Sequence, residues 1–465
     1  MGKKREKNNG KVQDQNMADA FQYEISLQLQ EGNEIGYDKP SVDLEIDEEA
    51  FEEPSSVTED GKKVSMEIKG SKCKALVEFR CRVEDSILEN YLLGKPSSEI
   101  SPAESAKAIE QLKEIKLWGV PLLPSKGHEG TDIVLLKFLK AKDYKVHEAF
   151  EMLLRTLKWR KEFKADGIVD ENLGLDFDNL AYLESRDKEG HPLFYNMYGA
   201  LKDKQTQYKI LESEEMRKRF LRWRVQHMEK AIQELEFEAG GTNSVVPIID
   251  LKQSPGPTTK KLHSVFRKSW KLLQDHYPEL IHKNIIINVP LWFYISHVFS
   301  SRLKAQRTNS KVVIARPGRV TSTLLKFISP ENLSVEYGGL KRENDNEFSP
   351  ENKVLMVKVK ANSTEHIQIL TPKVGVTVIW DLTVVGSWDI SYKEEFIPED
   401  EGSYKVLIQN EKDRKKGGGV RNSFYISEPG KIIISIGNLL LKKKNVLYRY
   451  KTKPTVPMYL RAINK

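Results

Sequence analysis

Residues 277–340 read YPELIHKNIIINVPLWFYISHVFSSRLKAQRTNSKVVIARPGRVTSTLLKFISPENLSVEYGGL, and this stretch decides the fold. It contains two short β-branched runs, 285–289 and 311–315, and turn residues flank them, as is typical of buried parallel strands. Between these runs, apolar residues recur at helical spacing beside a Trp-Phe-Tyr triplet. A helix with this many large apolar groups has more than one hydrophobic face, so a second protein layer or a lipid must cover it.

Size, composition and cysteine content indicate a cytoplasmic protein. The chain of 465 residues has room for about three domains. It contains no run of ~20 apolar residues that could span a membrane, and its N-terminus lacks an apolar signal core. Its two cysteines, Cys73 and Cys81, can form neither a disulfide framework nor a zinc site. We therefore expect reduced thiols in the cytosol.

Charge is distributed unevenly along the chain. Residues 1–70 hold 9 Lys and Arg against 17 Asp and Glu, a balance of −8, so that +15 remains for the rest of a chain whose total is +7. A basic body with an acidic tail indicates an anionic partner such as a membrane surface, a phosphoinositide or a nucleic acid. The tail is equally consistent with solubilising disorder. The most basic run, 217–224, alternates with large apolar residues, which favours a helix surface over a nucleic-acid interface.

The hydrophobic pattern divides the chain into four parts. Residues 1–70 show no sustained period and are predicted to form a disordered acidic tail. In 71–165, apolar residues step by three and four, which predicts an N-terminal helical bundle. In 171–342, strands and helices alternate, which predicts an α/β domain. In 349–454, short alternating runs separated by Gly and Pro predict an antiparallel β-sandwich.

No catalytic or metal-binding constellation emerges from the sequence. It contains no Gly-x-Ser-x-Gly elbow, no phosphate-binding Gly-rich loop and no His spacing of a metalloprotease. Asp250 and Glu279 could be imagined as an acid/base pair, but no nucleophile accompanies them and Asp250, at a strand end, is typical of a turn. We therefore predict a protein that is not an enzyme and has no cofactor or metal, and keep a hydrolase as a weak alternative.

A lipid pocket accounts for more of the sequence. A buried sheet beside an aromatic helix can form a cavity with a movable wall. Burying an acyl chain contributes roughly 0.8 kcal/mol per methylene group. A phosphorylated headgroup would need cations at the rim, for which the candidates are Lys311 and Arg316 on the last strand and Lys140 and Lys142 in the bundle. The alternative is a dry core helix with solvated lysines.

Several motifs resemble a known family. The run LLKFLKAKDYKVHEAFEMLLRTLKWRKEF (135–163) resembles the N-terminal helices of CRAL-TRIO lipid-transfer domains. The segments VVPIIDLK (245–252), YPELIHKNIIINVPLWF (277–293) and SPENLSVEYGG (329–339) resemble the core and closing signature of these domains. The blocks WDLTVVGSWDISYKEEF (380–396) and KKKNVLYRYKT (442–452) are similar to a GOLD β-sandwich. An acidic tail, a CRAL-TRIO unit and a GOLD domain in this order resemble the plant patellins.

The resemblance implies a peripheral membrane protein that binds phosphoinositides and acts in membrane trafficking, at the cell plate of dividing cells. Its expected locations are the cytoplasm, the plasma membrane and the cell plate. Its expected partners are phosphoinositides, the anionic membrane surface and proteins bound by the GOLD domain, with no nucleic acid. The alternative is a membrane-associated adaptor that recruits proteins through the GOLD domain and transfers no lipid.

The resemblance also implies site residues. A Thr and a Lys near the start of the last strand contact the headgroup in relatives, and the matching positions are Thr308 and Lys311. Glu279 belongs to the same neighbourhood. A basic pair in the helical bundle also contributes there, and this chain keeps Lys142 but has Asp143 at the second place.

Two further segments complete the expected site. A gate helix at about 291–303 would close the pocket, with the lipid-facing residues Leu291, Trp292, Phe293, Tyr294, Ile295, Val298 and Phe299. In the GOLD-like block, Lys442, Lys443 and Lys444 form a basic loop that would contribute ~1 kcal/mol each near an anionic leaflet. The alternative is that these lysines only solubilise a sheet edge.

Overall fold

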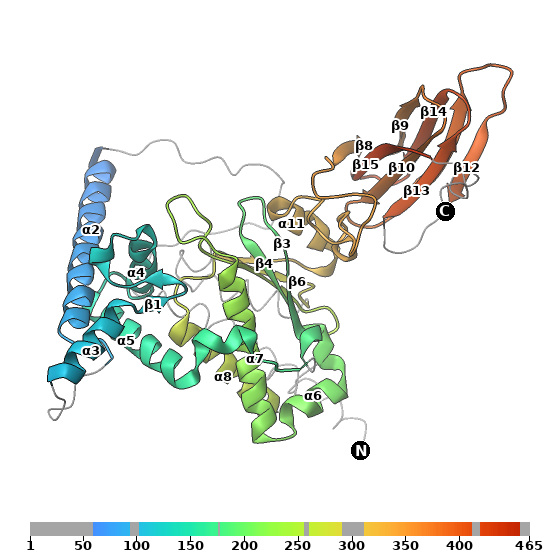
Figure 1. The fold of residues 1–465 in the computed structure, drawn as a ribbon. Helices are drawn as coiled ribbons and strands as arrows, with labels where there is room; N and C mark the ends of the chain where they lie inside the picture. The colour runs from blue at the N-terminus through green and yellow to red at the C-terminus, as the bar shows by residue number, and fades with distance from the viewer. Residues whose placement is uncertain are drawn as a thin grey trace, which may run out of the picture. The chain divides into compact units, whose positions relative to one another are not determined.

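The computed structural model describes residues 59–93, 102–174, 177–254, 260–290, 311–411 and 419–455. The chain divides into two compact units: one comprises Met1–Glu184 and His191–Ile314, the other Ser185–Gly190 and Ala315–Lys465. The first contains the helices of the bundle and a five-stranded sheet, and the second contains a β-sandwich and helix α11 (Val320–Phe327) (Figure 1). In the described part of the chain, none of the helices combines the length and apolar character that crossing a bilayer requires.

The N-terminal helices pack into the predicted bundle. They are α2 (Glu59–Leu88), α3 (Pro102–Lys113), α4 (Glu129–Ala141) and α5 (Val146–Phe163). Phe79, Val83 and Ile87 follow one face of α2 and are fully buried, because residues three and four apart share a helix face. Helix α2 begins at Glu59, inside the range 1–70 predicted as the tail, so the helix extends upstream of the apolar spacing that signals it.

The first unit is built on a sheet with the strand order β3-β4-β5-β6-β7. Its strands are β3 (Ala181–Arg186), β4 (Pro192–Met197), β5 (Val246–Asp250), β6 (Asn284–Ile287) and β7 (Val312–Ile314). Strands β4 to β7 run parallel to one another. Every residue of β5 and β6 is buried, as their largely apolar sequences indicate for strands covered on both faces. The α/β fold class predicted from the sequence is confirmed.

Helices α6 (Lys204–Leu211), α7 (Glu214–Gln233) and α8 (Lys260–His276) belong to the same unit, and α7 and α8 cover one face of the sheet (Figure 1). Phe194, Ile249 and Ile286 point from three neighbouring strands into the cluster formed with Phe220 and Trp223 of α7. This face of the sheet is therefore a conventional protein core.

The second unit contains two four-stranded antiparallel sheets, β13-β10-β15-β8 and β12-β11-β14-β9, as predicted. Their strands are β8 (Leu355–Val359), β9 (Ser363–Thr371), β10 (Val376–Val384), β11 (Ser391–Pro398), β12 (Val406–Glu411), β13 (Val420–Ile426), β14 (Gly430–Asn438) and β15 (Lys444–Pro454). Trp380 and Tyr392 fill the space between the sheets, and their Nε1 and hydroxyl donate to Glu394 Oε1 at 2.7 and 2.5 Å. This buried carboxylate is thus satisfied by the core around it.

A charge cluster fixes the segment that precedes the sandwich. Asp381 is fully buried, and its Oδ2 accepts hydrogen bonds from Arg421 at 2.6 Å and Arg449 at 3.3 Å. Arg421 also binds both oxygens of Asp345 at 2.7 Å. Burial opposes the charge of Asp345, but the hydrogen bonds from Arg421 and the backbone outweigh it and hold the pKa of Asp345 far below its usual range. Arg449 in addition donates to the Leu340 carbonyl at 2.6 Å.

A second buried ion pair joins the bundle to the α/β layer. Arg160 of α5 donates from Nη1 and Nη2 to Glu229 of α7 at 2.6 and 3.2 Å, and the Tyr277 hydroxyl donates to the same carboxylate at 2.5 Å. Burial disfavours the charged guanidinium, but the hydrogen bonds with Glu229 overcome this effect and raise the pKa of Arg160 above its ordinary value. Arg160 also binds Asp166, whose side chain is 72% exposed.

We expect Glu229→Ala to destabilise the first unit by about 3–5 kcal/mol, because the substitution leaves Arg160 buried without its main counter-charge. Asp166→Ala removes the exposed partner of the same arginine and should cost no more than about 1 kcal/mol. Urea unfolding followed by the helical circular-dichroism signal measures both variants. Equal losses for the two variants would contradict this account of the ion pair.

Candidate functional site

The sheet face turned away from α7 and α8 carries an apolar row. Successive side chains of a strand point to opposite faces, so the neighbours of the helix-covered residues point away from the helices. Tyr195, Ile248, Ile285 and Val313 lie in register across β4, β5, β6 and β7. The first three are fully buried. The row gives this face a continuous apolar floor about four strands wide.

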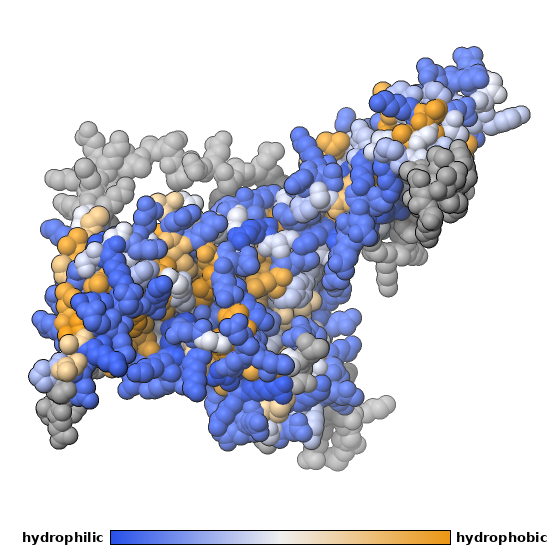
Figure 2. Space-filling view, in the orientation of Figure 1, coloured by the Kyte–Doolittle hydropathy of each residue, from blue (hydrophilic) through white to orange (hydrophobic). Residues whose placement is uncertain are grey.

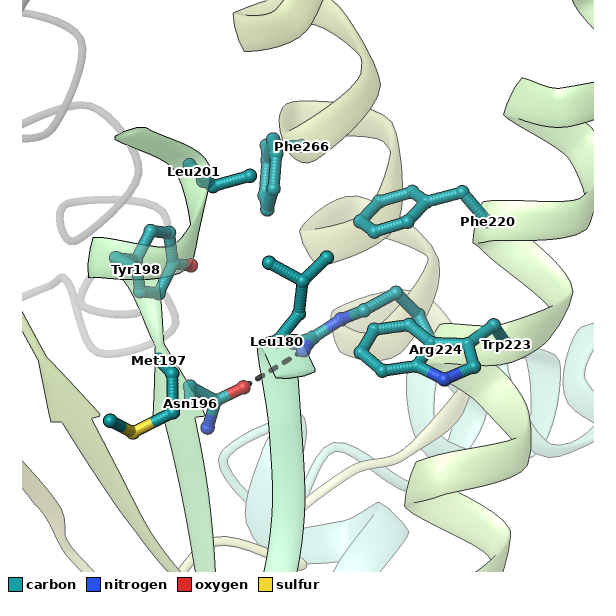
Figure 3. A pocket seen from close by; sticks show the side chains of 9 residues that line it. All are labelled: Leu180, Asn196, Met197, Tyr198, Leu201, Phe220, Trp223, Arg224 and Phe266. Carbon is teal, nitrogen blue, oxygen red and sulfur yellow. Dashed lines mark hydrogen bonds between the residues drawn. The ribbon is translucent and has the colours of Figure 1, made fainter. Parts of the chain in front are cut away.

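Aromatic side chains pack tightly on the helix-covered face in the described part of the chain. Figure 3 shows its remaining cavity, where aromatic rings from η5 (Tyr198–Lys202), α7 and α8 converge above β4. Its volume is 10 Å³, about that of a single water. Arg224 enters from α7 and donates from Nη1 to Asn196 Oδ1 at 2.8 Å. The opposite face, with its apolar row, is therefore the candidate surface for an acyl chain.

A larger cavity of 360 Å³ lies at the amino ends of β5, β6 and β7. Its volume falls within the range of roughly 300–1,000 Å³ that small-molecule sites occupy. One face of α4 supplies part of the lining, and the rest comes from the segments that enter the three strands. The lining residues are Ile133, Leu136, Lys137, Lys140, Asn243, Ser244, Glu279, Ile281, His282 and Lys311.

Three lysines and one glutamate set the electrostatics of this cavity. Lys311 Nζ lies 2.8 Å from Glu279 Oε2, and Lys140 is exposed at the rim. Lys137 is only 5% exposed, and its Nζ donates to Asn243 Oδ1 at 2.9 Å and to the Glu279 carbonyl at 3.0 Å. Burial, together with the positive charge of Lys140, lowers the pKa of Lys137 to about 7. The cavity therefore favours an anion, and binding an anion would favour the protonated form of Lys137.

Glu279 is held in a strained conformation. Its φ of 51° lies in the left-handed region, which is unfavourable for a residue with a side chain. Lys137 binds its carbonyl and Lys311 binds its carboxylate, so both ends of the residue are fixed. Two residues earlier, Tyr277 is anchored to Glu229. Strain maintained by surrounding contacts is a feature of binding and catalytic sites.

The structure brings together three of the residues predicted for the headgroup site, namely Lys140, Glu279 and Lys311. Lys142 lies at the C-cap of α4 and Arg316 follows the carboxyl end of β7, and neither lines the cavity. The position of Asp143 is also outside the lining, and the residue is exposed. The remaining predicted residues, Thr308 and the gate residues Leu291, Trp292, Phe293, Tyr294, Ile295, Val298 and Phe299, lie outside the described residues.

The sequence patterns did not identify Lys137 as a site residue. The signal was present, because Ile133, Leu136, Lys137 and Lys140 follow helical spacing and place a lysine on the apolar stripe of α4. A buried lysine shifts its pKa readily, which marks it as a candidate functional group.

Of the two residues considered as an acid/base pair, Asp250 has a structural role. Asp250 Oδ1 accepts hydrogen bonds from the Lys252 amide at 2.8 Å and Asn288 Nδ2 at 2.7 Å. It thus closes the turn after β5, as expected for an aspartate at a strand end. Glu279 pairs with Lys311.

The basic loop predicted in the sandwich separates into two parts. Lys442 and Lys443 are exposed. The side chain of Lys444 is only 11% exposed, and its Nζ donates to the Ser387 carbonyl and hydroxyl, both at 2.9 Å.

Comparison with known families matches three consecutive segments of the chain. Residues 75–155 match the CRAL/TRIO N-terminal domain, residues 176–339 match the CRAL/TRIO domain, and residues 360–444 match the Patellin-1-like C-terminal GOLD domain. Among solved structures, the crystal structure of Sfh5 aligns with a TM-score of 0.40 and 19% identity, over 55% of this chain and 83% of that one.

Several curated proteins are similar over most of this chain. Patellin-4 of Arabidopsis thaliana is 49% identical over 344 residues, which are 73% of this chain and 62% of that protein. Patellin-6 of Arabidopsis thaliana is 40% identical over 366 residues, which are 76% of this chain and 88% of that protein. The phosphatidylinositol transfer protein SFH5 of Cryptococcus neoformans is 31% identical over 252 residues, 48% of this chain and 80% of that protein. The chain spans about three fifths of the length of Patellin-4 and Patellin-5. With a CRAL/TRIO N-terminal domain, a CRAL/TRIO domain and a patellin-type GOLD domain in this order, the chain belongs to the patellin family.

Proposed function

We propose that this protein is a peripheral membrane protein that binds and transfers a phosphoinositide. The acyl chains would lie along the apolar row of Tyr195, Ile248 and Ile285, and the headgroup would occupy the cavity at the amino ends of the strands. The observation that carries the proposal is the cavity, which Lys137, Lys140 and Lys311 line together with Glu279. The proposal is also supported by a relative that is named as a phosphatidylinositol transfer protein.

The groups in the cavity suit an inositol phosphate chemically. Lysine ammonium groups bind phosphate oxygens as point charges. A carboxylate accepts hydrogen bonds, so Glu279 could bind ring hydroxyls, and Asn243 and His282 add further polar groups to the lining. Lys311 would exchange part of its contact with Glu279 for a phosphate oxygen. The phosphate would then neutralise lysine charge that is otherwise partly buried in the cavity.

We place this activity in membrane trafficking, at the cytoplasmic face of the plasma membrane and at the cell plate, as the resemblance to patellins suggests. The partners would be phosphoinositides, the anionic bilayer and proteins bound through the GOLD domain. The alternative is an adaptor that recruits proteins without transferring lipid. If the adaptor alternative holds, substitutions in the cavity will leave membrane recruitment unchanged.

The double substitution Lys137→Met, Lys311→Ala should weaken the phosphoinositide-dependent part of liposome binding by roughly 10- to 100-fold, since a hydrogen bond to a charged group contributes about 1.5–3 kcal/mol. Arg316→Ala is the matched control, because this cation is exposed and lies outside the cavity lining. Co-sedimentation with liposomes that contain or lack phosphoinositide gives the measurement. Loss of binding in the control alone, or in neither variant, would be incompatible with the proposed site.

Headgroup affinity should fall as pH rises above about 7, because Lys137 loses its proton there and an anion favours the protonated form. The affinity should fall by up to tenfold per pH unit. The fall should end above the pKa of Lys137 in the complex, which the bound anion raises. Lys137→Arg keeps its charge throughout this range and should flatten the profile. Binding of a soluble inositol phosphate, measured by calorimetry for both proteins, separates this effect from titration of the ligand. Identical pH profiles would show that Lys137 does not contact the headgroup.

A further inference from the structure

The loop between β14 and β15, residues 439–443, exposes apolar side chains at one end of the sandwich. Leu439 is 78% exposed, Leu440 39% and Leu441 87%. Single exposed hydrophobic residues are common, but a contiguous group marks an interaction site. Figure 2 shows hydrophilic residues over most of the visible surface, with hydrophobic residues over the first unit and in a smaller group over the sandwich. Two exposed lysines, Lys442 and Lys443, follow the three leucines directly.

Hydrogen bonds fix the shape of this loop. The side chain of Asn438 is fully buried, and its Nδ2 donates to the carbonyls of Lys360 at 3.1 Å and Lys442 at 2.9 Å. Its Oδ1 accepts from the Leu440 amide at 3.1 Å. At the other end of the loop, Lys444 Nζ is held by Ser387 at 2.9 Å. These hydrogen bonds hold the loop in one conformation with Leu439 and Leu441 exposed, so binding would not have to order the loop first.

The charges around the loop are mainly positive. Lys360, in the turn between β8 and β9 that Asn438 binds, is exposed like Lys442 and Lys443. An acidic group nearby is Asp389, whose carboxylate lies 3.9 Å from Lys444 Nζ. Apolar side chains beside lysines match the interface of an anionic bilayer, where hydrophobic groups enter the acyl boundary and cations remain among the headgroups.

We propose that residues 439–443 insert into an anionic lipid bilayer, with Leu439 and Leu441 entering the acyl region and Lys442 and Lys443 binding lipid phosphates. A bilayer is favoured over a protein partner because a five-residue loop offers far less than the roughly 1,000 Å² of a specific protein interface. A fluid bilayer can close around a small protrusion without a complementary surface. This site lies in the sandwich and is independent of the headgroup cavity.

The test uses the full chain and vesicles of phosphatidylcholine with phosphatidylserine, which contain no phosphoinositide. The double substitution Leu439→Ser, Leu441→Ser should weaken vesicle binding roughly tenfold or more, at both low and high salt. Lys442→Gln with Lys443→Gln should weaken binding mainly at low salt. Leu370→Ser is the matched control, since Leu370 is 74% exposed on β9. It lies near one end of β9, whereas Ser363, which pairs with Asn438 beside the loop, lies at the other end. Unchanged binding of the leucine double variant, or an equal loss in the control, would overturn the proposal.

A direct readout of insertion keeps the two proposals distinguishable. With Cys73→Ser and Cys81→Ser in place, an environment-sensitive fluorophore on Leu441→Cys should shift to the blue when these vesicles are added, and lipids with brominated acyl chains should quench it. The same label on Leu370→Cys should not respond. Failure of phosphoinositide binding in the cavity variants would leave this response intact. An unresponsive label at position 441, with vesicles bound, would refute insertion.

Discussion

The buried ion pair between Arg160 and Glu229 is the contact on which the cavity at the amino ends of β5, β6 and β7 depends. It joins α5 of the bundle to α7 of the sheet layer, and the Tyr277 hydroxyl donates to the same carboxylate. Tyr277 begins the turn that carries Glu279 with its positive φ, so the position of the cavity carboxylate follows from this network. Helix α4 belongs to the same bundle and supplies Lys137 and Lys140. One desolvated ion pair thus aligns the two halves of the cavity wall.

The two faces of the sheet have different roles. Aromatic side chains of α7 and α8 pack on one face around a cavity of 10 Å³. The other face presents the apolar row of Tyr195, Ile248 and Ile285, and beside it, at the amino ends of the same strands, lies the charged cavity. An amphipathic lipid needs an apolar surface beside an anion site. Because successive side chains of a strand point to opposite faces, the apolar row points away from the core on the helix-covered face.

The sequence predicted the architecture well because periodicity reports burial directly. The unbroken Ile run at 285–287 indicates a strand that is buried on both faces, and the alternation in β14 indicates a strand that is buried on one face. The site was predicted less completely. Lys140 and Lys311 were predicted from the need for cations at the pocket rim and Glu279 from the resemblance, whereas Lys137 was not predicted. Its role depends on desolvation and on the contact with a carbonyl 142 residues away in the sequence, and neither is visible in local spacing. The exposure of Leu439 and Leu441 likewise depends on the side-chain bonds of Asn438, which no local pattern predicts.

The central claim is that one unit combines an acyl-binding face with an anion-binding cavity. Native mass spectrometry of the 465-residue chain, after incubation with vesicles of mixed phospholipids, is the decisive measurement. The account predicts a single bound diacyl lipid whose headgroup carries inositol phosphate, enriched over the composition of the vesicles. A protein that remains free of lipid, or that takes up lipids without regard to headgroup charge, would contradict it.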